Sequence, residues 1–223
     1  MTLYFDNRPS DSPFVELIWG AYSEASGSFT STAESHWEMV ITKYLGKTTL
    51  TIRGPETQAT PADYPAEAEF FGIAFKHGIH MPHLPLYLLT DRNDTTLPEA
   101  TSRSFWLNGS VWEFPTFENA DTFVARLVRE GLLARDPVVT AVLRKEPVKL
   151  SVRTVQRRFL HVTGLTYGKL DQIERARQAV KLLEKGTSIA DAIYYTGYTD
   201  QPHLTKSLKH FMGRTPAQIL GKS

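Results

Sequence analysis

Hydrophobic positions change their spacing about halfway along the chain. In the first half, short segments rich in aromatic and β-branched residues are separated by Gly, Pro, Ser and Asp, a pattern typical of strands. It predicts strands at residues 14–22, 37–45, 47–53 and 69–75, with a tight hairpin at residues 44–47. Several short strands at this spacing indicate a β-sandwich or a small barrel.

From about residue 121 the apolar positions adopt the period of a helix. Five of them share one face of the first predicted helix: Phe123, Val124, Leu127, Val128 and Leu132. Further helices are predicted over residues 137–144, 169–184 and 188–195, and Gly186 and Gly197 follow the last two as stops. The expected fold class is therefore α+β. A β-rich domain with an aromatic connector occupies residues 1–118, and an all-α domain occupies residues 119–223.

Two segments of the helical half repeat each other. Residues 151–166 (SVRTVQRRFLHVTGLT) align without a gap with residues 200–215 (DQPHLTKSLKHFMGRT). Each copy begins with a residue preferred as a helix N-cap, Ser151 or Asp200, and reaches a glycine, Gly164 or Gly213. Because a solenoid needs at least about three repeats, a duplicated module is the better interpretation.

Each copy has an apolar stripe and an opposite polar, basic face. The stripes consist of Val155, Phe159 and Val162 in the first copy and of Leu204, Leu208 and Phe211 in the second. A helix with an exposed face of Arg, Gln, Thr and Lys fits the major groove of B-DNA, and a shorter predicted helix precedes each copy, as in a helix-turn-helix. We therefore predict DNA contacts from Arg153, Thr154, Gln156, Arg157, Gln201, His203, Thr205, Lys206 and Lys209.

The formal net charge of +1 hides a division between the two halves. Residues 1–118 contain 7 Lys and Arg against 15 Asp and Glu, whereas residues 119–223 contain 18 against 9. Because a basic face attracts a polyanion, this asymmetry favours nucleic acid as the partner of the second half, although such cations can also merely solvate a helical surface. The chain contains no cysteine, which excludes disulfides, thiolate nucleophiles, iron–sulfur clusters and zinc sites built on sulfur.

Residues 137–220 resemble the DNA-binding domain of the AraC/XylS family of bacterial transcription regulators. The resemblance rests on RTVQRRF followed by TG, Arg175 and Ala179 ahead of Leu182 and Leu183, SIADA, GYTDQPHLTKSLKHF, and Gly213 followed by Thr215 and Pro216. It implies helix-turn-helix units at about residues 137–164 and 188–213, joined by a long helix at about residues 168–185. In this family both recognition helices enter successive major grooves, a role that the resemblance gives to residues 152–162 and 201–211.

The sequence departs from that family at several places. The segment KEPVKL lengthens the turn before Ser151, and Ile193 stands where alanine is common. Leu204 and Leu208 replace phenylalanine, which should preserve the core. Pro202 replaces a residue able to hydrogen-bond a base, so we expect the second helix to contribute more phosphate contact than base reading. Alkyl-transfer repair proteins with similar domains are excluded, because they need a cysteine acceptor.

The N-terminal half resembles a cupin-like β-barrel more broadly, through HWEMV, IRGP and FFGIAFKHG. Many regulators of this family carry such a barrel as a sensor ahead of the DNA-binding domain. Its aromatic residues could line a pocket for a small molecule or simply fill a small barrel, and the pattern does not separate these readings. They are Trp19, Tyr22, Trp37, Tyr44, Phe70, Phe71 and Phe75.

Closely spaced histidines offer an alternative chemistry for this half. His77, His80 and His83, with His36 elsewhere, could bind a first-row metal and make it a cupin-type metalloenzyme or a metal sensor. However, HGIHMPHLP lacks the His-x-His and following Glu that metal cupins usually show, and its prolines indicate a turn. We therefore expect no metal or other cofactor and no enzymatic activity.

Double-stranded DNA is the expected partner of the helical half, and a small-molecule effector that of the β-rich half. Residues 121–133 are a candidate surface for a homodimer, although their apolar face could instead pack inside the DNA-binding domain. No apolar run reaches the roughly 18 residues that cross a bilayer, and residues 1–12 are polar, unlike a signal peptide. We expect a cytoplasmic protein with no membrane partner.

Overall fold

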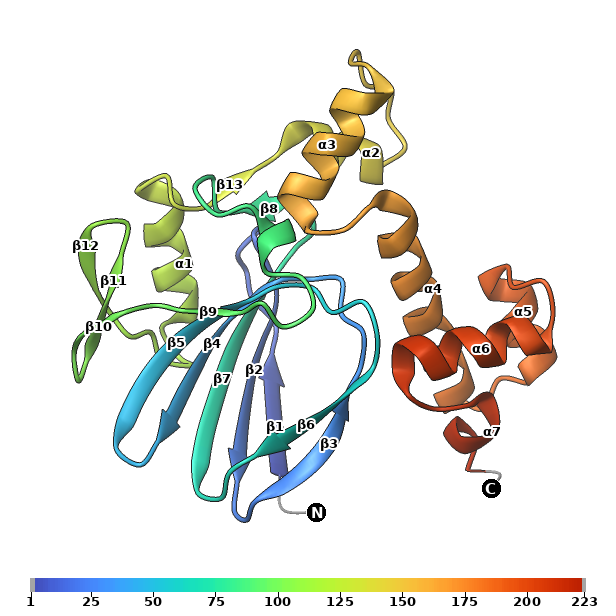
Figure 1. Ribbon diagram of the computed structural model, residues 1–223, viewed down its shortest axis with the longest axis horizontal. Helices are drawn as coiled ribbons and strands as arrows, with labels where there is room; N and C mark the ends of the chain where they lie inside the picture. The colour runs from blue at the N-terminus through green and yellow to red at the C-terminus, as the bar shows by residue number, and fades with distance from the viewer. Residues whose placement is uncertain (1–2, 222–223) are drawn as a thin grey trace.

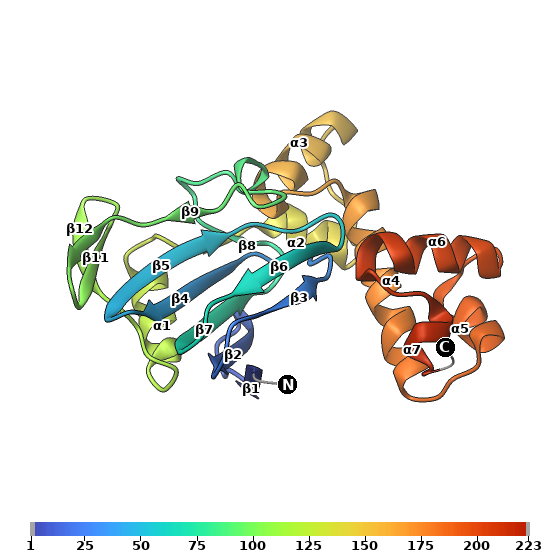
Figure 2. The ribbon, with the colours of Figure 1, turned by 60° about the horizontal axis from the view of Figure 1, so that its bottom comes forward.

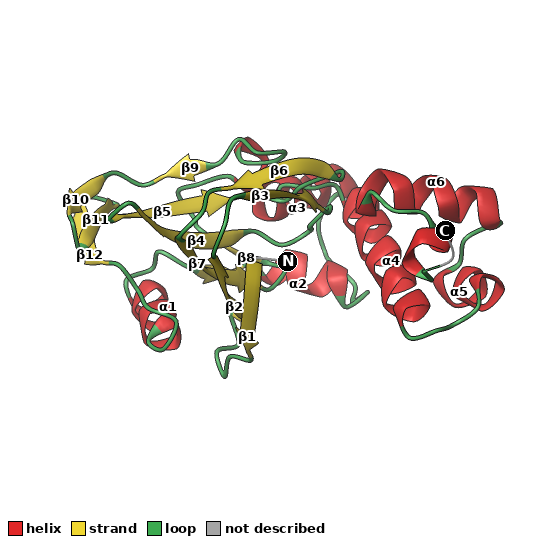
Figure 3. Cartoon of the chain, turned by 90° about the horizontal axis from the view of Figure 1, so that it is seen from below, coloured by secondary structure: helices red, strands yellow, loops and turns green. Residues whose placement is uncertain are grey.

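The computed structural model of the protein describes residues 3–221. Strands dominate its first half and helices its second, as the sequence predicts (Figure 1). Figure 3 shows most of the helices gathered beyond one end of the sheet, away from the short helix that follows the strands. No described helix has both the length and the hydropathy needed to cross a membrane.

The main sheet contains six strands and is antiparallel at each pairing. Its order is β1 (Leu3–Arg8), β2 (Val15–Ser23), β7 (Ala68–Phe75), β4 (Glu38–Tyr44), β5 (Lys47–Arg53) and β9 (Thr95–Thr96). The four strands predicted from the sequence are confirmed as β2, β4, β5 and β7. The hairpin is confirmed as well: Tyr44 pairs with Lys47 across Leu45 and Gly46, both at positive φ, which matches the twist of the flanking strands.

A two-stranded ribbon lies over part of the sheet (Figure 2). It pairs β3 (Gly27–Ser31) with β6 (Thr60–Tyr64), and neither strand is evident from the sequence, because β3 is short and polar and β6 contains Pro61 and Asp63. The edge strands β1 and β9 are not paired with each other within residues 3–221. Among the described strands the architecture is therefore an open sheet with a covering ribbon, which does not confirm the expected β-sandwich or small barrel.

The aromatic connector is packed rather than free. It forms a small sheet of β10 (Glu99–Thr101), β11 (Ser104–Leu107) and β12 (Ser110–Glu113), in which Phe105 and Trp112 are buried. The helix α1 (Ala120–Arg129) follows and lays Phe123 against Trp112, with ring centroids 6.0 Å apart.

The packing of α1 differs from both alternatives expected for its apolar face. Its apolar residues Phe123, Val124 and Leu127, together with Leu132 and Leu133 after it, join the core of the β-rich half. The apolar face of α1 is therefore covered by the β-rich half of the same chain. It packs neither against a second copy nor inside the DNA-binding domain. Because one core extends to Leu133, we propose that the boundary between the halves lies after this residue rather than at residue 118.

The helical half comprises six helices among the described residues: α2 (Pro137–Leu143), α3 (Val152–Thr163), α4 (Tyr167–Glu184), α5 (Ile189–Thr196), α6 (Gln201–Met212) and α7 (Pro216–Ile219). The short strands β8 (Ile79–His80) and β13 (Ala134–Arg135) pair before them, and the one-turn helix η1 (Leu86–Leu88) lies near α3. The predicted N-caps Ser151 and Asp200 are confirmed, because the side chain of each accepts a hydrogen bond from a backbone N–H. Ser188 caps α5 in the same way.

A second core holds these helices together. It consists of buried side chains from α2 to α6, including Phe159, Val162, Leu204, Leu208 and Phe211 of the two predicted stripes. Val155 is half-buried at the edge of the first stripe. One member of this core, Ala33, comes from the N-terminal half, which is the first sign that the two halves are packed together.

Candidate DNA-binding surface

The pair α2 and α3 is tied together by one buried carboxylate. Asp136, which is 3% exposed, accepts the N–H of Val139 at 2.9 Å and so caps α2. Its other oxygen accepts Nε of Arg158 in α3 at 2.5 Å. Arg158 therefore joins the two helices although its side chain is 46% exposed, whereas the neighbouring Arg157 is exposed and forms no such ion pair. Apart from its place before Pro137, nothing in the sequence pointed to Asp136.

The outer face of α3 carries the residues predicted from the sequence. Arg153, Gln156 and Arg157 are exposed. Thr154 is half-buried, and its hydroxyl lies 2.8 Å from that of the N-cap Ser151, so it is partly used in the cap.

The pair α5 and α6 presents a similar face. Gln201, His203, Lys206 and Lys209 are exposed along α6, and Thr205 is half-buried. Side chains of α6 hold the turn that precedes it. The hydroxyl of Tyr198 in this turn lies 2.7 Å from that of Ser207, and the His203 ring packs edge-on against Tyr198.

The cations of these two faces form no ion pairs with carboxylates among residues 3–221. The ion pairs among residues 3–221 all involve other cations, such as Arg158 with Asp136 and Arg214 with Glu184. Arg153 and Arg157 on α3 and the lysines of α6 thus face solvent with their charge uncompensated by a contacting carboxylate. Such cations are available to neutralise phosphates or to hydrogen-bond base edges.

The C-terminal end of α3 is held by the N-terminal half. Thr90 donates its hydroxyl to the carbonyl of Gly164 at 3.0 Å, and a Cβ on Gly164 would lie 2.8 Å from Cγ of Pro55. Gly164 itself adopts φ +75°, the left-handed conformation that ends the helix.

The C-terminal end of α6 is held in the same way. The N–H of Ala33 donates to the carbonyl of Phe211 at 2.7 Å, and the N–H of Ala59 donates to that of His210 at 2.9 Å. These bonds satisfy carbonyls that the helix itself leaves unpaired. Both helices therefore have their C-terminal ends against the β-rich half and extend away from it towards their N-terminal ends (Figure 1). Sequence reasoning missed Ala33 and Ala59, because a backbone donor leaves no residue-type signal.

The three predicted histidines do not gather at one point. His83 is exposed in a turn, and His80 lies in β8, where burial lowers the pKa of its ring. Among residues 3–221, the group able to hold a metal is instead His36, His77 and Glu174, of which only His77 belonged to the predicted trio.

Electrostatics around His77 keep the ring uncharged. Burial and the neighbouring His36 lower the pKa of His77 to about 3, so its imidazole is neutral near pH 7. Burial by itself would raise the pKa of Glu34, but a hydrogen bond from His36 and the charge of Arg177 outweigh it and lower this pKa to about 2. Glu34 is therefore a carboxylate at neutral pH.

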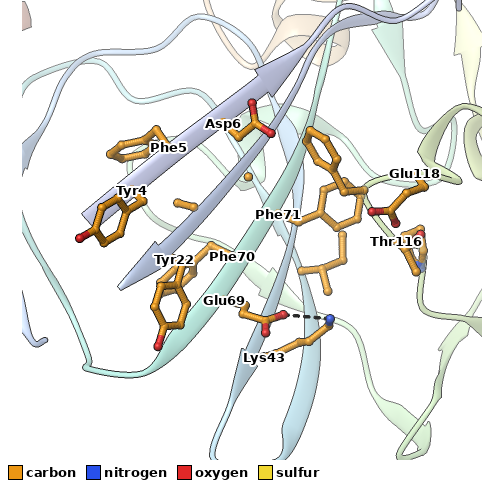
Figure 4. Close-up of a pocket in the computed structure, with 15 residues that line it drawn as sticks. Tyr4, Phe5, Asp6, Tyr22, Lys43, Glu69, Phe70, Phe71, Thr116 and Glu118 are labelled. Carbon is orange, nitrogen blue, oxygen red and sulfur yellow. Dashed lines mark hydrogen bonds and ion pairs between the residues drawn. The ribbon is translucent and has the colours of Figure 1, made fainter. Parts of the chain in front are cut away.

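Two hollows flank the main sheet. One, of about 450 Å³, is lined by aromatic residues of β1, β2 and β7 and by residues 115–118, with the Lys43–Glu69 ion pair of 3.0 Å at its border (Figure 4). The other, of about 480 Å³, lies between the sheet and the ribbon of β3 and β6. Of the predicted pocket aromatics, Trp19 and Phe70 reach the second hollow, whereas Trp37 and Phe75 stack in the core with ring centroids 4.1 Å apart.

Comparison with known families identifies the C-terminal part. Residues 146–222 match the model of a helix-turn-helix domain family. Neither the comparison with curated proteins nor that with solved structures returned a match. The matched range begins in the turn after α2 and includes α3 to α7, so it carries both basic faces described above. The match does not bear on the β-rich half. Residues 146–222 are therefore a helix-turn-helix domain of the AraC type, which supports the role of a DNA-binding transcriptional regulator.

Proposed function

We propose that the protein regulates transcription by binding a specific DNA sequence through α3 and α6, each lying in a major groove. The observation that carries this proposal is the pair of exposed basic faces, uncompensated by carboxylates and extending away from the β-rich half. Recognition helices commonly contact bases through their N-terminal residues, which here are Arg153 and Arg157 in α3 and Gln201 and Lys206 in α6.

The length of α4 supports the use of both helices. This helix joins the two units and has 18 residues, which corresponds to about 27 Å at about 1.5 Å per residue. Successive major grooves on one face of B-DNA lie about 34 Å apart. A rigid spacer of this length is suited to hold two recognition helices at neighbouring grooves. Pro202 in the first turn of α6 favours a larger share of phosphate contact from that helix.

Selection from a random duplex library followed by fluorescence anisotropy tests the proposal. If Arg157 reads a base, Arg157→Ala should weaken binding to the selected duplex by about 1–3 kcal/mol, or about 5- to 150-fold, and relax specificity at one position. If Lys206 neutralises a phosphate, Lys206→Ala should weaken all duplexes similarly and reduce the slope of log K against log salt by about 0.9.

Arg129→Ala is the matched control, because Arg129 is an exposed cation on α1 with a side chain 72% exposed, outside both faces. It should leave affinity and salt slope unchanged. Equal losses in Arg129→Ala and Arg157→Ala would contradict a defined surface, and failure of selection to enrich any sequence would contradict specific binding.

We further propose that a small molecule bound in the hollow between sheet and ribbon controls this activity. Its volume of about 480 Å³ falls in the range of ligand sites. Aromatic side chains of Trp19, Phe29 and Tyr64 supply apolar walls. The charged residues of the lining are Arg53, Asp63, Arg92 and Asp94. This composition suits a small molecule with an apolar ring and a hydrogen-bonding polar group.

The polar part of the hollow is organised before any ligand arrives. Trp19 donates Nε1 to Glu38 at 2.8 Å, and Arg53 pairs with Glu38 at 3.2 Å, with Glu56 at 2.8 Å and with Asp94 at 3.4 Å. A preformed network of this kind lowers the ordering cost of binding a polar group.

The ribbon offers a physical route from this hollow to the DNA-binding surface. Phe29 and Tyr64 line the hollow from β3 and β6, and the same two strands lead directly to Ala33 and Ala59, which bond the end of α6. A ligand that favours one position of the ribbon would therefore bias the position of α6, and the bias is limited by its difference in affinity for the two states.

A thermal-shift screen of small aromatic compounds on the full chain tests the effector proposal. A hit should lose its shift in Trp19→Ala and keep it in Tyr22→Ala, a residue of the same strand that lines the other hollow. Retention in Trp19→Ala with loss in Tyr22→Ala would move the site to the hollow of Figure 4 and refute this assignment.

A further inference from the structure

Three side chains that are far apart in the sequence converge where the two halves meet. His36 precedes β4, His77 follows β7, and Glu174 lies in the middle of α4. Each offers one ligand atom, and these atoms all lie within 4.8 Å of one another. Two imidazoles and a carboxylate form a donor set typical of zinc and other divalent first-row ions.

Neighbouring groups orient this set. Nδ1 of His36 donates a hydrogen bond to the Glu34 carboxylate at 2.8 Å, which leaves the lone pair of Nε2 free to bind a metal ion. A carboxylate hydrogen-bonded to the second nitrogen is the usual support of a metal-binding histidine. Arg177, one turn along α4 from Glu174, pairs with Glu34 and so fixes the supporting carboxylate as well.

Ser35 stands at the centre of the group. Its hydroxyl lies 2.9 Å from Nε2 of His77 and bonds to the carboxylate of Glu174. The hydroxyl therefore bridges two of the three donors, which is the position that an ion between them would take over or share.

We propose that His36, His77 and Glu174 bind a divalent transition-metal ion, with Zn²⁺ as the reference case. Donor atoms of a tetrahedral zinc site lie about 2.0–2.2 Å from the ion, so the three residues must close in on a common point. The rings of His36 and His77 are stacked, with centroids 3.9 Å apart and planes 18° apart. Because each lone pair lies in the plane of its own ring and the two planes are separate and nearly parallel, one ion cannot lie in both planes. Binding therefore requires one ring to turn and the Ser35 hydroxyl to move aside or to become the fourth ligand.

A metal ion at this site would link the two halves of the chain. Two ligands belong to the β-rich half and the third to α4, the helix between α3 and α6. An ion would fasten α4 to the β-rich half and add to the hydrogen bonds already present there. Its effect on DNA binding rests on the function proposed above, whereas the site itself does not.

Metal binding by the full chain without DNA tests the site directly. Protein stripped with a chelator and dialysed is titrated with Zn²⁺ by calorimetry, and bound metal is counted by elemental analysis. Co²⁺, added in place of Zn²⁺, should give the visible absorption of a low-coordinate site. We expect one equivalent bound, with loss of this stoichiometric binding in His77→Ala and a drop in affinity of about tenfold or more in Glu174→Gln.

His83→Ala is the matched control, because this histidine is exposed and lies outside the group. It should bind one equivalent as the parent chain does. Glu174→Gln keeps the shape and hydrogen-bonding capacity of the side chain, so it separates loss of a ligand from loss of folding, which circular dichroism monitors. Absence of stoichiometric binding by the parent chain, or unchanged binding in both His77→Ala and Glu174→Gln, would overturn the proposal. Neither result bears on whether α3 and α6 bind DNA.

Discussion

The glycine at the end of α3 provides a direct measure of how tightly this helix is held by the β-rich half. A Cβ at Gly164 would lie 2.8 Å from Cγ of Pro55 and 3.0 Å from the carbonyl oxygen of Leu86. A proline ring and a backbone carbonyl cannot easily move aside. Gly197 ends α5 at nearly the same backbone angle, φ +69° against +75°, but a Cβ there would meet nothing within 4 Å.

The two substitutions share one cost and differ in another. Alanine in the left-handed conformation costs about 1–2 kcal/mol at either position. Gly164→Ala adds an overlap with a packed neighbour, and such overpacking typically costs about 1–3 kcal/mol more. For a chain of this size about 1 kcal/mol lowers Tm by about 2–4 °C, so Gly164→Ala should melt about 2–12 °C below Gly197→Ala.

Thermal unfolding followed by circular dichroism measures this difference, and a double-mutant cycle assigns it. Pro55→Ala removes the closest contact, so it should restore part of the stability of Gly164→Ala, the remainder reflecting the Leu86 carbonyl. Equal melting temperatures for Gly164→Ala and Gly197→Ala would refute the reasoning, because α3 would then not be packed against the β-rich half as described.

Three further predictions concern stability. Phe159→Ala should lower the free energy of unfolding by about 3–5 kcal/mol in urea denaturation, since the side chain is 2% exposed in the second core, and a loss below 1 kcal/mol would contradict that burial. Asp136→Ala should lower the free energy of unfolding by about 0.5–2 kcal/mol through the lost helix cap, and by more because Arg158 loses its partner. Arg158→Met should therefore lower this free energy less in the Asp136→Ala background than in the parent chain. Burial by itself would raise the pKa of Asp121, but hydrogen bonds from Ser10 and Arg8 outweigh it and lower this pKa. The ionised Asp121 therefore stabilises the folded state above the unfolded pKa of about 3.9, and this stabilisation is lost as pH falls. Asp121→Asn should therefore flatten the acid side of the stability curve by less than about 1 kcal/mol, and an unchanged curve would exclude this contribution.

The sequence alone determined features that depend on neighbours along the chain. Helix caps such as Ser151 and Asp200 act over about three residues, and an apolar stripe is visible because every third or fourth position faces the core. The strands β2, β4, β5 and β7 could also be predicted, because each alternates or concentrates apolar residues over a short window. The repeat of α3 in α6 made the DNA-binding half the most predictable part.

Tertiary structure decided what joins distant residues. Glu34 and Arg177 are 143 positions apart, and Ser35 and Glu174 are 139 apart, so no local pattern could place them together. Likewise, the spacing of the histidines grouped His77 with His80 and His83, whereas folding brings it to His36. Periodicity records which face of an element is buried, but not against what, and this is why the packing of α1 and the hold of the β-rich half on α3 and α6 emerged only from the folded chain.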